Sequence, residues 1–189
     1  MDPKQLLKEH ISKTAKLSDD EFDDFFNSFT AESYKKGAYI FAAGDKIDCE
    51  YFVVSGCIKT FYINDNLKMF VLQFAMPTCW ASDYSALYSG TKATINIGCI
   101  TDTTVLRLSN KAREDACKKF HQVEHFFRTR MTGEYVASQK RLLSMMNNDV
   151  KHRYEELMAQ YPELYQIVPK QLIAAYLGVS RETLSRLHH

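Results

Sequence analysis

The strongest constraint on the fold is a change in residue type near Ser109-Asn110. Between Tyr34 and Leu108, runs of β-branched and aromatic residues are interrupted about every ten residues by turn-forming pairs such as Gly44-Asp45 and Ser55-Gly56. After Asn110, proline is absent until Pro162 and the residues favour helix. Closely spaced turns predict an antiparallel β-roll, sandwich or barrel. The chain is therefore expected to be α+β, with the sheet preceding most of the helices.

The predicted elements follow these patterns. The strands are expected at residues 39–41, 50–54, 57–63, 69–74, 95–100 and 104–108, with a short helix at about 83–88. An earlier helix opens at Asp2-Pro3 and carries Leu6, Leu7 and Ile11. A second helix begins with the capping box formed by Ser18 and Glu21. It is followed at helical spacing by Phe22, Phe25, Phe26 and Phe29.

Composition excludes several classes of protein. There are 24 Lys+Arg and 23 Asp+Glu, so the formal net charge is +1 and no global positive field attracts nucleic acid or membrane. No apolar run approaches the roughly 18 residues of a membrane span, and the first residues lack a signal peptide's hydrophobic stretch. We therefore expect a cytoplasmic protein without a membrane partner.

Neither a metal site, a cofactor nor an enzyme is predicted. The five cysteines are scattered without a Cys-x-x-Cys pair, which argues against a zinc knuckle or a disulfide framework. Cys117, His121 and His125 are spaced by four residues, but a helix face rotates by about 80° over eight residues, so the three should not converge on one metal. No nucleophile–base pair or phosphate-binding loop emerges, so catalysis is not expected.

One long helix is predicted from His121 to Met146, and it is longer than a small domain requires. Its apolar residues follow at spacings of three or four, and we expect this stripe to form a homodimer interface. The predicted interface residues are Val123, Phe127, Met131 and Tyr135. The alternative is that the stripe packs across the β-domain of the same chain.

The last third of the chain predicts a helix-turn-helix. Helices are expected at residues 150–160 and 170–177, followed by a turn at Gly178-Val179 and a final helix that Ser180 caps and that runs into the terminus. Ala174, Gly178 and Leu184 have the spacing at which two helices cross at a sharp angle. The first turns of the second helix would enter the DNA major groove.

The residues not needed for packing suit DNA recognition. An arginine offers two donors to guanine, and a glutamate accepts from cytosine. The predicted DNA-binding residues are Lys170, Gln171, Ser180, Arg181, Glu182, Thr183, Ser185 and Arg186. The alternatives are a charged, solvated helix face, and a small-molecule-binding signalling module that acts through protein partners.

The chain resembles the Crp/Fnr family of bacterial transcription regulators. Residues 180–183 (Ser-Arg-Glu-Thr) with Arg186 resemble the family's recognition helix, and residues 41–45 and 51–56 resemble the paired glycine turns of the cyclic-nucleotide-binding β-roll. The short ending is similar to that of compact members from Bacteroidetes-type bacteria. The resemblance implies a β-roll sensor at residues 1–109, connecting and dimerisation helices at 110–147, and a DNA-binding domain at 148–189. It also implies a homodimer, a near-palindromic double-stranded DNA operator and RNA polymerase as a candidate partner.

The chain departs from the family at the effector site. Asp83 stands where the family has the acid that binds the ribose, but Ala93 occupies the position of the arginine that binds the cyclic phosphate. A buried phosphate would lack a counter-charge, so the effector is expected to be a small molecule other than cyclic AMP. The candidate pocket residues are Phe74, Trp80, Asp83, Tyr84 and Thr94. Alternatively, side chains close the cavity, and the aromatic residues belong to the core.

Overall fold

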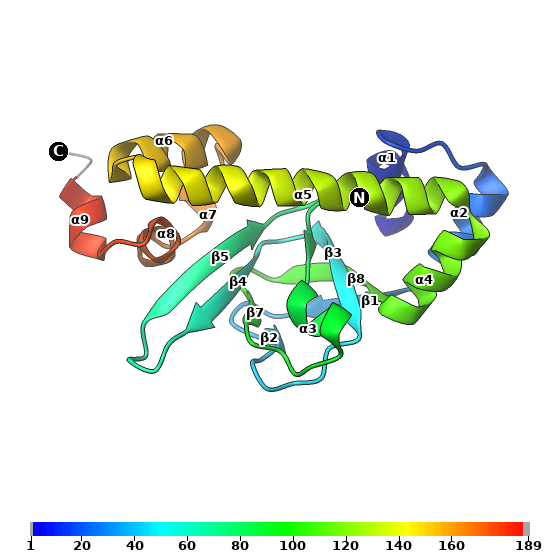
Figure 1. Cartoon of the computed structure of the whole chain (residues 1–189), viewed down its shortest axis with the longest axis horizontal. Coiled ribbons are helices and arrows are strands. Elements are labelled where there is room, and N and C mark those ends of the chain that lie inside the picture. Colours follow the sequence, from blue (N-terminus) through cyan, green and yellow to red (C-terminus); the bar gives the residue numbers. More distant parts are fainter. Residues whose placement is uncertain (1, 187–189) are drawn as a thin grey trace.

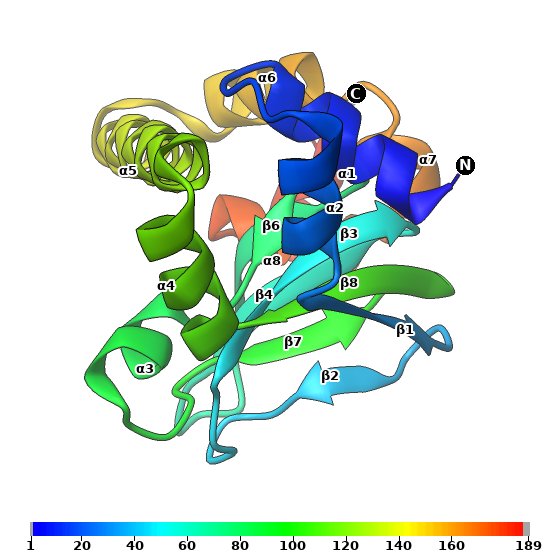
Figure 2. The same cartoon turned by 90° about the vertical axis from the view of Figure 1, so that its right-hand side faces the viewer.

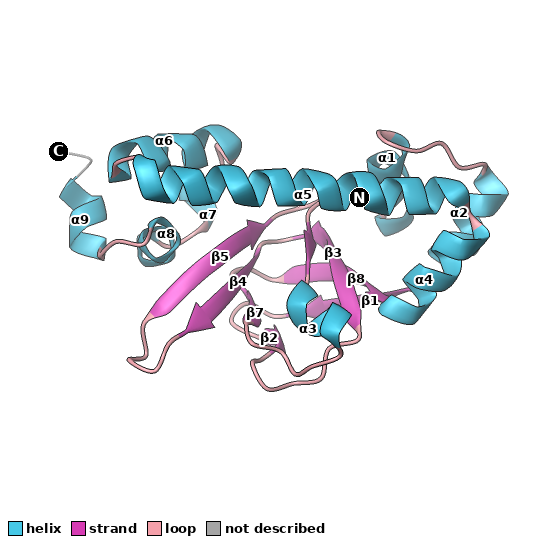
Figure 3. Ribbon diagram, in the orientation of Figure 1, coloured by secondary structure: helices cyan, strands magenta, loops and turns pink. Residues whose placement is uncertain are grey.

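The structure, a computed structural model, describes residues 2–186. Two four-stranded antiparallel sheets form its centre, with strand orders β1-β8-β3-β6 and β2-β7-β4-β5 (Figure 3). The strands are β1 (Phe29–Tyr34), β2 (Tyr39–Phe41), β3 (Cys49–Ser55), β4 (Ile58–Ile63), β5 (Met69–Ala75), β6 (Trp80–Ala81), β7 (Asn96–Cys99) and β8 (Thr103–Ser109). The predicted α+β fold with an N-terminal β-roll is confirmed.

The helices are arranged around one long member, α5, which crosses above the sheets (Figure 1). Helices α1, α2 and α4 lie near its N-terminal end, and α6 to α9 surround its C-terminal end (Figures 1 and 2). The helices are α1 (Pro3–Ser12), α2 (Asp19–Phe26), α3 (Tyr84–Ser89), α4 (Asn110–Lys119), α5 (His121–Asn147), α6 (Val150–Gln160), α7 (Leu164–Ile167), α8 (Lys170–Leu177) and α9 (Arg181–Arg186).

Side-chain caps start several of these helices at the residues that the sequence indicated. Asp2 caps α1, and Ser18 and Glu21 form the predicted capping box of α2. However, α2 ends at Phe26, and Phe29 begins β1 instead of continuing the helix. The Phe29 ring still packs on the Phe25 ring, with centroids 5.0 Å apart. Strands β1 and β6 and helix α7 were not predicted.

The buried side chains form three core clusters. The first packs α1, α2, α4 and the N-terminal half of α5 on the sheet that contains β3, around Phe52 and Trp80. The second fills the space between the two sheets, around Val53 and Ile97. The third joins residues of β4 and β5, such as Phe74, to the helices after α5. The helices that follow α5 therefore share a core with the second sheet.

This packing corrects the prediction for two of the dimer-interface residues. Val123 and Phe127 are buried in the first core cluster of their own chain, so they cannot contact a second copy. The alternative interpretation, that the stripe packs across the β-domain, applies to this half of α5.

Helix α5 has 27 residues, but its sequence includes several charged side chains. Among the described residues 2–186, no helix combines the length and the apolar character that crossing a bilayer requires.

Candidate functional site

Helices α8 and α9 are joined by a tight turn that requires one residue in the left-handed backbone conformation. Gly178 ends α8 at a φ of 74°, a conformation that glycine adopts without strain. The Ser180 hydroxyl then accepts a hydrogen bond of 3.1 Å from the Thr183 backbone amide. Ala174 and Leu184 are buried in the third core cluster, so they fix the crossing of the two helices. The geometry is that of a helix-turn-helix.

The opposite face of α9 is open to solvent. Arg181, Glu182, Ser185 and Arg186 are exposed. Within residues 2–186, neither arginine makes a hydrogen bond or an ion pair through its side chain. The pKa of Glu182 is lowered by a hydrogen bond from its own backbone amide and then by the Ser180 hydroxyl. The carboxylate is therefore available as a charged acceptor beside two arginine donors.

The other predicted DNA-binding residues border this face. Lys170 and Gln171 are exposed in the first turn of α8, and Ser180 is exposed before α9. Thr183 is half-buried, and its side-chain oxygen lies 3.2 Å from that of Ser180. Thus Ser180 and Thr183 form the cap, whereas Lys170 and Gln171 are free to contact a ligand. The expected continuation of α9 into residues 187–189 lies outside the described residues.

Arg141 of α5 holds the helix-turn-helix against the second sheet. Strand β5 has a bulge at Leu72, which pairs with no residue of β4. Arg141 donates hydrogen bonds to the carbonyl oxygens of Leu72, of Val71 at 2.9 Å and of Tyr176 at 3.1 Å. Its guanidinium lies 3.8 Å from the Tyr176 ring centroid, and Tyr176 stacks on Phe74. One half-buried arginine therefore joins β5, α5 and α8.

A cavity of about 460 Å³ lies where the second sheet, α5 and the later helices meet. Phe74 and Tyr84 line it from the β-domain, and Met131 and Glu134 line it from α5. Tyr176 lines it from α8. A ligand in this cavity would touch the β-domain, the long helix and the helix-turn-helix at once.

Three of the five predicted pocket residues do not line this cavity. Trp80 is buried in the first core cluster, where its indole donates to the His10 ring at 3.4 Å. The Asp83 carboxylate caps α3, accepting from the Ala86 amide at 3.0 Å and the Thr94 amide at 2.7 Å. Burial raises the pKa of Asp83, but these hydrogen bonds outweigh it and lower the pKa overall. The Asp83 carboxylate is thus fully used in hydrogen bonds to Thr94 and to backbone amides.

A buried ionic network holds α5 on the β-domain next to the cavity. Glu50 of β3 accepts from Arg130 of α5 at 2.5 Å, and Arg113 of α4 lies 3.6 Å from its other oxygen. The side chains of Glu50, Arg113 and Arg130 are 1%, 4% and 7% exposed. Arg130 also donates to the Tyr84 hydroxyl at 3.0 Å. Tyr84, which lines the cavity, is therefore hydrogen-bonded to the Arg130–Glu50 ion pair that holds α5 on the sheet.

The sequence interpretation missed the contribution of α5 to the cavity. Met131 and Tyr135, predicted at a dimer interface, also line the cavity, together with Glu134, Ser138 and Arg141. The spacing of 131, 134, 138 and 141 is itself helical and could have indicated a second functional face.

Metal-ligating side chains do not gather into a group of three or more among residues 2–186. The five cysteines are free thiols, and Cys57 is buried in the third core cluster. Burial raises the pKa of Cys57 to about 12, so its thiol is protonated and packs as a small apolar group.

Comparison with known proteins gives a family match for the β-domain and a match for the fold. Residues 31–120 match the cyclic nucleotide-binding domain family. FixK2 from Bradyrhizobium japonicum superposes with a TM-score of 0.73 at 20% identity, covering 85% of this chain and 82% of FixK2. None of the curated proteins is similar enough in sequence to match.

Two further structures give the same result. A putative Crp/Fnr family transcriptional regulator from Eubacterium rectale has a TM-score of 0.70 at 15% identity, covering 90% of this chain and 82% of that protein. The c-di-GMP-responsive regulator CLP from Xanthomonas campestris has a TM-score of 0.68 at 14% identity, covering 90% and 89%. Residues 31–120 therefore resemble a cyclic nucleotide-binding domain, and the chain has the fold of solved Crp/Fnr family regulators.

Proposed function

We propose that the protein is a homodimeric transcription regulator that binds DNA sequence-specifically through α9. The observation that carries this proposal is the face of α9, where Arg181, Glu182 and Arg186 are exposed while Leu184 anchors the helix in the core. The arginines lack hydrogen-bonded and ion-pair partners within residues 2–186. The fold that the chain shares with Crp/Fnr regulators supports the same function.

The chemistry of this face fits the edges of base pairs in the major groove. Arg181 and Arg186 can each donate two hydrogen bonds to guanine, and the ionised Glu182 can accept from cytosine. Lys170 lies at the start of α8, where a positive charge contacts phosphate and sets orientation rather than sequence preference.

We propose that the dimer forms through the C-terminal half of α5. Leu142 and Met146 are 62% and 73% exposed, and Tyr135, Val136 and Leu143 are exposed beside them. These residues recur at spacings of three, four and seven along one side of the helix, as in a coiled-coil seam. This seam keeps Tyr135 of the predicted stripe and adds Val136 and Leu143, which each lie about 100° around the helix from the preceding residue. A two-fold axis along it would place two α9 helices on half-sites about 34–36 Å apart.

We place the effector in the 460 Å³ cavity, which is lined by Phe74, Tyr84 and Tyr176. Ala93 occupies the position at which the family's cyclic-nucleotide sites have arginine, and it is buried. A cyclic phosphate would lack that counter-charge, so the effector belongs to another chemical class. Because Tyr176 and Arg141 line the cavity and hold α8, an occupied cavity can bias the position of the helix-turn-helix.

The test compares two variants on sequences selected from a random DNA pool. Arg181→Ala should cost about 1–3 kcal/mol in binding and relax preference at one base position. Lys170→Ala should weaken binding evenly across sequences and reduce its dependence on salt. If Arg181→Ala also weakened all sequences evenly, base reading by α9 would be rejected. Saturable small-molecule binding with no DNA preference would instead support a signalling module.

A further inference from the structure

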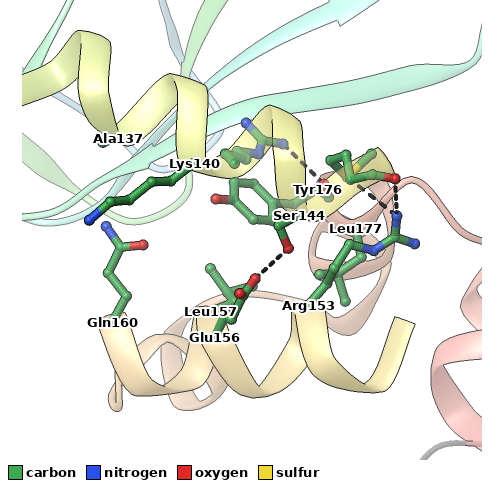
Figure 4. Close-up of a pocket in the computed structure, with 11 residues that line it drawn as sticks. Ala137, Lys140, Ser144, Arg153, Glu156, Leu157, Gln160, Tyr176 and Leu177 are labelled. Carbon is green, nitrogen blue, oxygen red and sulfur yellow. Dashed lines mark hydrogen bonds between the residues drawn. The ribbon is translucent and has the colours of Figure 1, made fainter. Parts of the chain in front are cut away.

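A second cavity, which shares Arg141 and Tyr176 with the first, is lined by α5, α6 and α8 (Figure 4). Its volume is about 320 Å³, within the range of small-ligand sites. Much of its wall is apolar, with Leu157 from α6, Leu177 from α8 and Ala137 from α5. Such a wall favours the hydrocarbon or aromatic part of a ligand.

The charged groups in this cavity are unbalanced. Lys140, Arg141 and Arg153 line it, and Glu156 is the one acidic residue among the lining side chains in the described part of the chain. The lining charge is thus 3 − 1 = +2. The Glu156 carboxylate is already engaged, since it accepts from Ser144 and lies 3.3 Å from His152.

None of the three cations has a carboxylate partner within residues 2–186. Arg141 is bound only to backbone carbonyl oxygens, and burial lowers its pKa. Arg153 donates to the Met145 carbonyl oxygen at 3.2 Å, whereas its Nε atom is buried without a partner. The Lys140 ammonium makes no hydrogen bond or ion pair there. Lys140 is exposed and Arg141 and Arg153 are half-buried, so the cavity is lined by positive charges that no carboxylate balances, and it favours an anion.

The arrangement of the side chains orients that anion. Lys140 and Gln160 both line the cavity, and in the view of Figure 4 their side chains extend toward the same end, with the Tyr176 ring between that end and the Ser144–Glu156 pair. With the carboxylate of a ligand at the Lys140 end, the rest of that ligand would extend along Tyr176 and Leu157. One free ammonium matches one negative charge, and the apolar wall matches an uncharged remainder.

We propose that this cavity binds a small organic acid, with its carboxylate on Lys140 and its apolar part between α5, α6 and α8. The walls come from both sides of the junction at Asn147–Asp149, so the bound acid bridges the long helix and the helix-turn-helix. Its occupancy would then bias the angle between them. The binding site itself does not depend on the proposed DNA-binding function.

The test is calorimetric titration of the full chain, without DNA, with octanoate and 3-phenylpropanoate. Octan-1-ol and octylamine are the neutral and cationic controls matched to octanoate in chain length. Octanoate should bind at least about tenfold more tightly than octan-1-ol, the difference expected for one charge-assisted hydrogen bond. Equal binding of all three chain-matched probes, or no saturable binding of either acid, would overturn the proposal.

Two charge-removing variants locate the site. Lys140→Gln should weaken octanoate binding about tenfold and leave octan-1-ol unchanged. Lys151→Gln removes the same charge from an exposed position of α6 that does not line the cavity, so it should leave octanoate binding unchanged. Circular dichroism verifies that both variants fold. Equal losses in both variants would show that octanoate responds to surface charge and not to this cavity.

Discussion

The buried carboxylate of Glu50 should be a principal support of the long helix. It lies between Arg130 of α5 and Arg113 of α4, and all three side chains are nearly inaccessible to solvent. Glu50→Gln keeps the shape of the side chain but removes its charge. Two arginines would then remain in the interior without their shared carboxylate, and the second oxygen of Glu50 already lacks a hydrogen bond.

Removing one partner of a buried ion pair costs about 3–5 kcal/mol, because the remaining charge is left uncompensated. In a domain of 150–250 residues, each kcal/mol lowers Tm by about 2–4 °C. Glu50→Gln should therefore lower Tm by about 6–20 °C. The aromatic rings beside Arg130, including Trp80 at 4.7 Å from its guanidinium carbon, offset only part of this loss.

The assay is thermal and urea unfolding followed by circular dichroism. Glu114→Gln is the matched control, since Glu114 pairs with Arg113 at 2.7 Å but is 51% exposed. Exposed pairs contribute about 0–1 kcal/mol, so this control should change stability little. Equal effects of the two variants, or a loss below about 1 kcal/mol for Glu50→Gln, would refute the role assigned to the network.

Three further predictions follow from particular contacts. Burial lowers the pKa of His10 from 6.5 to about 4, so the unfolded chain binds a proton at higher pH than the folded chain. The free energy of unfolding should therefore decrease as the pH is lowered from 6.5 to 4. His10→Gln should flatten this slope in urea titrations at several pH values. Leu142→Glu with Leu143→Glu should give monomers in sedimentation equilibrium, whereas an unchanged mass would place the interface elsewhere. Gly56→Ala should cost more than about 2 kcal/mol in urea unfolding, because φ is +86° and the added Cβ would meet the Asp102 backbone; a neutral result would contradict this.

Most of the fold could be predicted because local patterns and long-range packing agree. The strand at Tyr39–Phe41 and the helix at Val150–Gln160 have the predicted bounds, since turns and caps delimit them. Phe29 shows where this agreement ends. Its spacing from Phe25 is helical, yet pairing of β1 with β8 places it opposite Leu108, and the ladder outweighs the local pattern.

The two faces of α5 could not be told apart from the sequence. Val123 and Phe127 share the spacing of an interface but are covered by α1, α2 and α4 of the same chain. Apolar residues occur on more than one side of this helix, so periodicity indicates a buried stripe without saying which surface covers it. The exposed Leu143 and Met146 became dimer candidates only once the contacts were known.

The site was predictable where it is local and not where it depends on tertiary structure. The α9 face follows from the spacing of Ala174, Gly178 and Leu184 along the chain. The 460 Å³ cavity combines side chains from β5, α5 and α8, and no short pattern links Phe74 to Tyr176. Asp83 was placed by resemblance at a ligand position, but its oxygens are already used as a cap.

The most direct test of sequence-specific DNA binding is fluorescence anisotropy of the full chain with a selected duplex and with a scrambled duplex of the same composition. At physiological salt, the selected near-palindrome should bind at least about 10³-fold more tightly, the lower limit for specific regulators. Equal affinities for the two duplexes would contradict base reading by Arg181 and Arg186.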